Sequence, residues 1–173
     1  LSRGTAIRFV GYETLRGEGE VLALISNASR TDSVETGAEA DVVLDETPFY
    51  AQSGGQVGDE GVFLNGETRF RVTDTVKYGT DLIVHRGVVE AGTLRVGQKL
   101  QAEVDPVRRK ATACNHSATH LLHAALREVL GEHVKQAGSL VSPERLRFDF
   151  SHFAQVDADT LREIERRGNQ HIR

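Results

Sequence analysis

The sequence predicts an α+β protein in which an all-β part precedes a mixed part. The first 105 residues contain short β-rich runs separated by Gly and Asp, a spacing typical of a small barrel or sandwich. At residue 105 the hydrophobic period changes from that of a strand to that of a helix. We therefore expect one domain over residues 1–105 and the N-terminal part of a second, incomplete domain over residues 106–173.

Six β-rich runs make up the predicted first domain. One pair of them flanks Asn65-Gly66, a strong hairpin signal because both central residues of a type I′ turn need a positive φ angle. The runs are residues 20–25, 41–46, 61–65, 68–77, 81–89 and 98–104.

A long helix is predicted to open the second domain. Asp105 can cap its N-terminus, and Pro106 suits the first helical position because its missing N–H is not needed there. Residues 107–130 contain no Gly or Pro, and Gly131 can end the helix. A hairpin of strands 134–141 and 145–150 is expected next, and then a last helix capped by either Asp157 or Asp159.

Composition excludes several classes of protein. An apolar fraction of 39% is enough to bury a core, a single Cys cannot form a disulfide framework, and no run of about 18 apolar residues could span a membrane. A lone unpaired cysteine fits a reducing compartment, so we expect a cytoplasmic protein. Because the sequence starts at Leu1 without Met and ends inside a helical pattern at Arg173, we expect a piece of a longer chain.

Charge is unevenly distributed along the chain. Residues 1–105 carry 10 Lys/Arg against 17 Asp/Glu, whereas residues 106–173 carry 11 against 8. The acidic first part argues against non-specific coating of nucleic acid. Small basic clusters in the second part fit either a solvated face or contacts with RNA phosphates, which salt would weaken; they are residues 108–110, Arg145 with Arg147, and Arg166 with Arg167.

The predicted long helix carries two histidines one turn apart, His116 and His120. Positions four apart lie on one helix face, so the two side chains can bind one metal ion, or can form polar surface or a hydrogen-bonded pair. His123 is too far along the axis from His116 to join them as a third ligand. We expect the scattered histidines to be structural; they are His85, His133, His152 and His171.

A glycine-rich stretch, residues 47–59, is the other unusual feature. It matches neither a P-loop nor a dinucleotide-binding pattern. Gly54 and Gly55 can take positive φ angles and let backbone N–H groups approach a ligand, and Gln56 offers both a donor and an acceptor. The stretch fits either a tight turn between strands or a loop over an oxygen-rich ligand.

These stretches together resemble the editing region of alanyl-tRNA synthetases. The resemblance implies a glycine-rich β-barrel followed by an α/β editing core, and hydrolysis of wrongly made Ser-tRNA(Ala) and Gly-tRNA(Ala). It also implies zinc held by His-x-x-x-His, which maps onto His116 and His120, plus a later Cys-x-x-x-His that this sequence lacks. The residues that carry the resemblance are Glu46 to Gly61, Asn115 to Leu126, Gly138 to Val141 and Arg147 to His152.

The resemblance also suggests roles for individual residues. Gln56 is expected to orient the ribose or the ester as the catalytic residue. The expected partners are the acceptor end of tRNA(Ala) and the rest of the parent synthetase, which would bind ATP and Mg²⁺ elsewhere. A stand-alone editing hydrolase and a non-catalytic tRNA-positioning module remain alternatives. The residues expected to bind substrate are Ser53, Gly54, Gly55, Gln136, Gly138 and Ser139.

Overall fold

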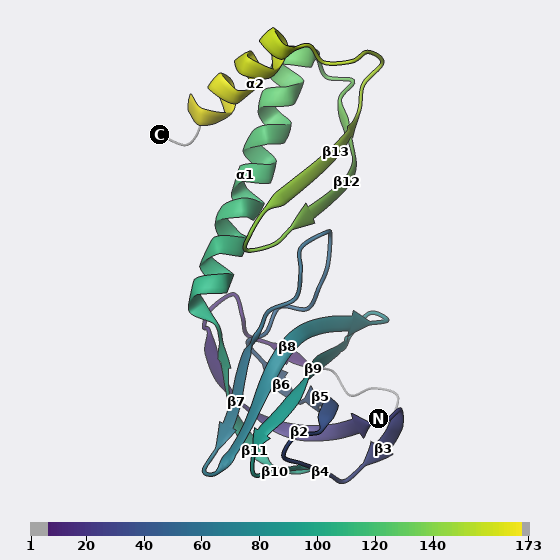
Figure 1. Ribbon diagram of the computed structural model, residues 1–173, viewed down its shortest axis with the longest axis vertical. Coiled ribbons are helices and arrows are strands. Elements are labelled where there is room, and N and C mark those ends of the chain that lie inside the picture. The colour runs from purple at the N-terminus through teal and green to yellow at the C-terminus, as the bar shows by residue number, and fades with distance from the viewer. Residues whose placement is uncertain (1–6, 171–173) are drawn as a thin grey trace. The chain divides into compact units, whose positions relative to one another are not determined.

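The computed structural model describes residues 7–170 and divides into two compact units (Figure 1). The barrel unit comprises Leu1–Ser53 and Val57–Arg109, and the helical unit comprises Gly54–Gln56 and Lys110–Arg173. The three residues Gly54–Gln56 therefore belong with the helical unit, although the barrel unit surrounds them in sequence. His171 and the end of the predicted last helix lie outside the described residues.

Six antiparallel strands close the barrel. Neighbours follow the order β11-β7-β8-β9-β5-β2, and β11 pairs with β2 to complete the circle, so the small barrel is confirmed. A closed sheet leaves no unpaired edge. The strands are β2 (Arg16–Ser26), β5 (Glu39–Leu44), β7 (Gly61–Asn65), β8 (Thr68–Tyr78), β9 (Leu82–Ala91) and β11 (Lys99–Val104).

The barrel interior is filled by apolar side chains, most of them from alternate strand positions and one, Phe49, from the segment between β6 and β7. Phe49, Phe63 and Phe70 are fully buried, and their rings meet at centroid distances of 5.3 and 5.7 Å. Five shorter strands decorate the barrel and were not predicted; they are β1 (Arg8–Phe9), β3 (Ser29–Thr31), β4 (Ser33–Glu35), β6 (Glu46–Thr47) and β10 (Thr93–Arg95).

The hairpin between β7 and β8 forms one residue later than predicted. Asn65 pairs with Thr68, so the two loop residues are Gly66 and Glu67. Of these only Gly66 has a positive φ, 53°, the pattern of a type II′ turn with Gly at its first central position. Asn65 instead donates a hydrogen bond from Nδ2 to the Lys99 carbonyl, which keeps it in the strand.

The long helix α1 (Pro106–Leu130) has the predicted bounds. Asp105 Oδ1 accepts hydrogen bonds from the N–H groups of Val107 and Arg108, at 2.9 and 3.0 Å, and so caps the helix. At the other end Gly131 has a φ of 114°, which a side chain would oppose.

The helical unit continues with a two-stranded hairpin and a second helix. Strands β12 (Lys135–Val141) and β13 (Leu146–Ser151) pair antiparallel, and α2 (Ala158–Gln170) is capped by Asp157, whose Oδ1 accepts the Thr160 N–H at 2.8 Å. This hydrogen bond holds the pKa of Asp157 below its ordinary value. The α+β class is confirmed, whereas the only sheet described in this unit is antiparallel rather than the α/β core expected.

A small core joins these elements. It forms where side chains of β13 and α2 pack against the C-terminal half of α1, and it includes Phe148 and Phe150 on one face of β13 as predicted. Its fully buried members are Ala125, Leu126, Val134 and Ile164. None of the helices described is long and apolar enough to cross a membrane.

Candidate functional site

Helix α1 presents His116 and His120 side by side on an exposed face. The two Nε2 atoms lie 3.1 Å apart and the ring centroids 5.0 Å apart, because one helical turn separates the residues. His123, further along, packs its ring against Phe148 at 5.0 Å, and its Nε2 is buried without a hydrogen-bond partner among the described residues.

Gln56 fixes the orientation of the first imidazole. His116 Nδ1 lies 2.8 Å from Gln56 Oε1. An amide oxygen only accepts, so Nδ1 carries the proton and the lone pair of His116 is on Nε2, which points toward His120. A carbonyl that accepts from the second ring nitrogen is the arrangement that orients metal-binding histidines in proteins.

Residues Gly54–Gln56, called the glycine loop from here on, are hydrogen-bonded to strand β12. The Val141 N–H donates a hydrogen bond to the Gly55 carbonyl at 2.8 Å, and Gln56 forms a parallel bridge with Val141. Gly54 and Gly55 have φ angles of 58° and 87°. A Cβ on Gly55 would lie 2.4 Å from the carbonyl oxygen of Ser139, so only glycine allows this approach.

The β12 segment places the remaining predicted residues beside this loop. Ser139 Oγ donates to the Gly54 carbonyl at 3.2 Å, and Gln136 Nε2 donates to Ser139 Oγ at 3.2 Å. The strand register shifts between Gln136 and Gly138. A Cβ on Gly138 would lie 2.9 Å from Asp149 Oδ2, a contact that a mobile carboxylate can relieve.

Eight of the nine residues singled out from sequence thus lie in one unit. Ser53 belongs to the barrel unit, where it lines a small aromatic pocket. No sequence pattern indicated that pocket, because its aromatic residues come from segments about 40 residues apart. The eight are Gly54, Gly55, Gln56, His116, His120, Gln136, Gly138 and Ser139.

The two Nε2 atoms have a spacing compatible with two nitrogen ligands on one ion. A separation of 3.1 Å between Nε2 atoms is close to the spacing of two nitrogen ligands around tetrahedral zinc, whose Zn–N bonds are about 2.0–2.1 Å. Within residues 7–170 no group of three or more His, Cys, Asp or Glu side chains is placed to hold an ion. Among the described residues, His116 and His120 therefore have no third side chain of these types placed to share an ion with them.

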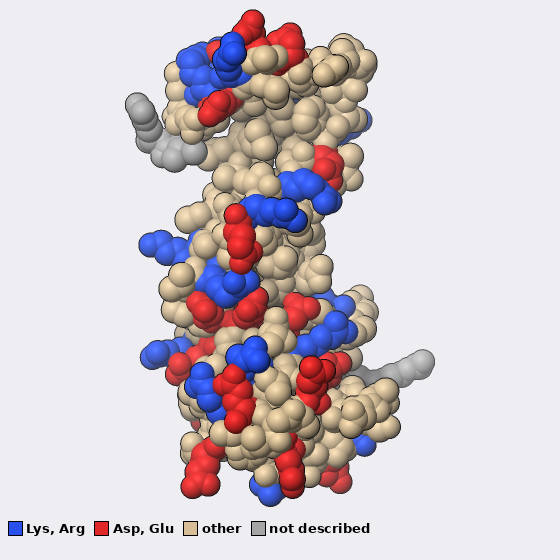
Figure 2. Space-filling view, viewed as in Figure 1, with Lys and Arg blue, Asp and Glu red and all other residues tan. Residues whose placement is uncertain are grey.

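The basic clusters differ from one another in what they contact. Arg109 is an internal residue, hydrogen-bonded to the Asp59 carboxylate and to the carbonyls of Gly11 and Pro48, so it does not face RNA phosphates. Arg147 pairs with Asp149 at 3.1 Å. Acidic and basic side chains are interspersed over the visible face of the barrel unit (Figure 2).

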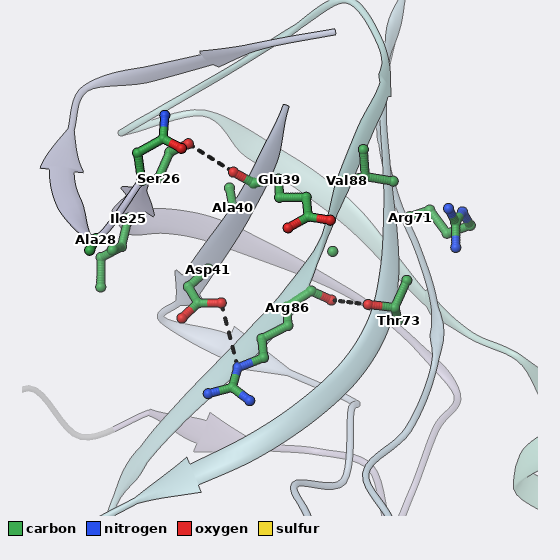
Figure 3. A pocket seen from close by; sticks show the side chains of 12 residues that line it. Ile25, Ser26, Ala28, Glu39, Ala40, Asp41, Arg71, Thr73, Arg86 and Val88 are labelled. Carbon is green, nitrogen blue, oxygen red and sulfur yellow. Dashed lines mark hydrogen bonds and ion pairs between the residues drawn. The ribbon is translucent and has the colours of Figure 1, made fainter. Parts of the chain in front are cut away.

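A larger hollow on the barrel unit is lined by two arginines that are already paired with carboxylates, and by Glu39, whose carboxylate forms no ion pair with any of residues 7–170. Its volume is about 440 Å³. Figure 3 shows Arg86 directed at Asp41, with Nε 3.6 Å from Oδ1, and Thr73 bonded to the Arg86 carbonyl. Arg71 is paired with Glu90 at 2.6 Å. Because each guanidinium has a carboxylate partner, this hollow offers little free positive charge for an anionic ligand.

Comparison with known proteins identifies the family. The sequence model of the family described as tRNA synthetases class II (A) matches residues 3–108. The chain belongs to the class II (A) tRNA synthetase family. It is 55% identical over 168 residues to the alanine–tRNA ligase of Methylococcus capsulatus, covering 97% of the chain and 19% of that protein. The corresponding enzyme of Paracidovorax citrulli is 53% identical over 169 residues, covering 98% of the chain and 18% of that protein.

The chain therefore spans about a fifth of the length of the alanine–tRNA ligases that it matches. This match corrects the expected function. The prediction of an editing fragment that hydrolyses Ser-tRNA(Ala) and Gly-tRNA(Ala) is wrong, because the matching family is that of the class II synthetases themselves. The prediction took residues 46–61 as a sign of the editing region. These residues lie inside the range that the synthetase family model matches. The two alternatives, a stand-alone editing hydrolase and a non-catalytic tRNA-positioning module, are wrong for the same reason.

Proposed function

We propose that this chain is a segment of an alanine–tRNA ligase, which uses ATP to attach alanine to tRNA(Ala). The observation that carries this is 55% identity over 97% of the chain to a protein of that name, together with the class II family match. ATP and Mg²⁺ would be bound by the parent enzyme outside this segment. The parent enzyme would act in the cytoplasm, where tRNA is charged for protein synthesis.

The complete protein that contains this segment is expected to charge tRNA(Ala) with alanine. ATP–pyrophosphate exchange should depend on alanine, and labelled alanine should become acid-precipitable on tRNA(Ala) but not on a tRNA of another specificity. Absence of alanine-dependent exchange by the folded complete protein would contradict the proposed function.

Within the segment, His116, His120 and Gln56 support a role in binding. The Nε2 atoms of His116 and His120 converge, and Gln56 holds the His116 ring. We assign His116 and His120 as two zinc ligands and Gln56 as a positioning residue that orients the His116 ring. Zinc, when bound, would supply a positive charge that attracts an oxygen of the tRNA end. The glycine loop and Ser139 would line the same site.

Zinc is expected to bind the 173-residue chain weakly with one ion per chain, because two imidazoles complete only half of a tetrahedral ligand set. Calorimetric titration with zinc should lose the binding heat in His116→Ala and in His120→Ala. Gln56→Ala should weaken binding by about 10-fold, the lower end of the range for residues that orient a ligand.

His133→Ala is the matched control. His133 and His152 form a second imidazole pair in the helical unit, with Nε2 and Nδ1 2.8 Å apart. If zinc binding survives in His116→Ala and disappears in His133→Ala, the metal belongs to this second pair and the assignment is wrong.

A further inference from the structure

A small pocket on the barrel unit is lined by aromatic rings and one lysine. Its volume is about 200 Å³. This is below the roughly 300–1,000 Å³ of pockets that enclose a whole drug-sized ligand, and it suits a single flat ring system. Its lining includes Phe9, Tyr12, Tyr50, Ser53, Lys77 and Ile83.

The pairing of two short strands brings the aromatic residues together. Strand β1 pairs parallel with β6, which places Phe9 opposite Thr47 and close to the segment that carries Tyr50. The Phe9 ring meets the Tyr50 ring at a centroid distance of 6.1 Å and the Tyr12 ring at 5.0 Å, both edge to face. These contacts hold the rings in place before any ligand arrives.

Tyr12 is held in position although it is exposed. A turn fixes its backbone, because the Glu13 N–H donates to the Val10 carbonyl at 3.0 Å, and Arg109 Nη1 donates to the Gly11 carbonyl at 2.9 Å. Nevertheless 86% of Tyr12 is accessible to solvent. An anchored aromatic side chain with most of its surface free is suited to stacking against a flat partner.

Lys77 supplies charge at the same pocket. It lies near the end of β8, is exposed, and forms no ion pair with any of residues 7–170. The arginines of the barrel unit described above are paired with carboxylates, so this ammonium group differs from them in being free to meet an anion. Aromatic rings beside a free cation are the combination with which proteins hold unpaired nucleotides, through base stacking and phosphate contact.

We propose that this pocket binds one unpaired nucleotide of an RNA strand. The base stacks against Tyr12 and the Phe9–Tyr50 pair, and Lys77 contacts a backbone phosphate. Ser53, the last residue of the barrel unit before Gly54, also lines the pocket. The assignment rests on the proposed function only in taking tRNA, which has an unpaired 3′ end, as the natural RNA.

The test uses the 173-residue chain and a single-stranded RNA octamer with 2-aminopurine at its 3′ end. Stacking is expected to quench the 2-aminopurine fluorescence on binding. Tyr12→Ala should weaken binding by about 5-fold to 150-fold and abolish the quenching, whereas Tyr12→Phe should bind and quench as the parent chain does. Lys77→Gln should lower the slope of log K against log salt by about 0.7.

Phe153→Ala is the matched control, because Phe153 is an equally exposed aromatic residue, 83% accessible, in the helical unit. Equal binding by Tyr12→Ala and Phe153→Ala would overturn the proposal, and so would equal binding of a strand whose terminal base is missing. If the pocket variants bind normally while the complete protein charges tRNA with alanine, the pocket assignment alone is wrong. Quenching that depends on Tyr12, without alanine charging, would support the pocket and contradict the ligase function.

Discussion

Replacing Arg109 by alanine is expected to lower the free energy of unfolding of the barrel unit by about 3–5 kcal/mol. Arg109 Nε lies 2.9 and 3.0 Å from the two carboxylate oxygens of Asp59, and its Nη atoms bond to the Gly11 and Pro48 carbonyls. The Asp59 side chain is only 6% exposed. Without the guanidinium, a buried carboxylate would keep only its hydrogen bond from the Tyr50 N–H.

Urea unfolding followed by tyrosine fluorescence measures this effect in the barrel unit alone. The chain has no Trp, and its three tyrosines, Tyr12, Tyr50 and Tyr78, all lie in that unit. Arg108→Ala is the control, since Arg108 pairs with Glu60 at the surface and such pairs contribute about 0–1 kcal/mol. Equal unfolding midpoints for Arg108→Ala and Arg109→Ala would show that the ion pair between Arg109 and Asp59 does not stabilise the barrel unit more than a surface pair does.

Acid is expected to destabilise the barrel unit through His85. Burial lowers the pKa of His85 from 6.5 to about 4, although a hydrogen bond to the Val42 carbonyl partly opposes the shift. His85 is therefore protonated below about pH 6.5 in the unfolded chain, but only below about pH 4 in the folded chain. Stability is complete above pH 6.5 and falls as the pH drops toward 4, by about 3 kcal/mol in total.

The structure shows why neutral His85 is preferred. Nδ1–H donates to the Val42 carbonyl at 3.0 Å, so Nε2 accepts from the Thr47 hydroxyl at 2.8 Å. The ring also packs between Phe49 and Phe63, at centroid distances of 5.4 and 5.0 Å, where a positive charge has no compensating carboxylate among these neighbours.

His85→Asn removes the titrating group and keeps a donor for the Val42 carbonyl. This variant should be less stable than the parent at pH 7, because it leaves part of the core unfilled. Its stability should nevertheless change less between pH 7 and pH 5, a range in which ordinary carboxylates remain largely ionised. A parallel pH dependence in the two proteins, measured by tyrosine fluorescence in urea, would contradict the assignment to His85.

The elements that the sequence predicted well are those decided by local interactions. Helix α1 has its predicted bounds because Asp105 supplies the cap and Gly131 the left-handed terminus, and neither signal depends on distant residues. Strand β7 likewise matches the predicted residues 61–65. The strands that were missed have two or three residues each, too short for a hydrophobic period, and exist because a distant segment pairs with them.

The candidate site shows the same division. The spacing of His116 and His120 follows from helical geometry, so their convergence was predictable. The contact between Gln56 and His116 joins positions 60 residues apart, and the sequence singled out both residues without indicating that they touch. Arg109, grouped by sequence with its basic neighbours, is shown by the fold to be an internal partner of Asp59.

By itself, the sequence determined the α+β class, the caps of the long helix and the adjacency of two imidazoles, because each depends on residues within one or two turns or strands. Only the tertiary structure decided that the six long strands close into a barrel, that Gly54–Gln56 pack with the helical unit, and that Phe9, Tyr12, Tyr50 and Lys77 share a pocket. These features require segments tens of residues apart to meet, and a local sequence pattern does not indicate which distant segment it will contact.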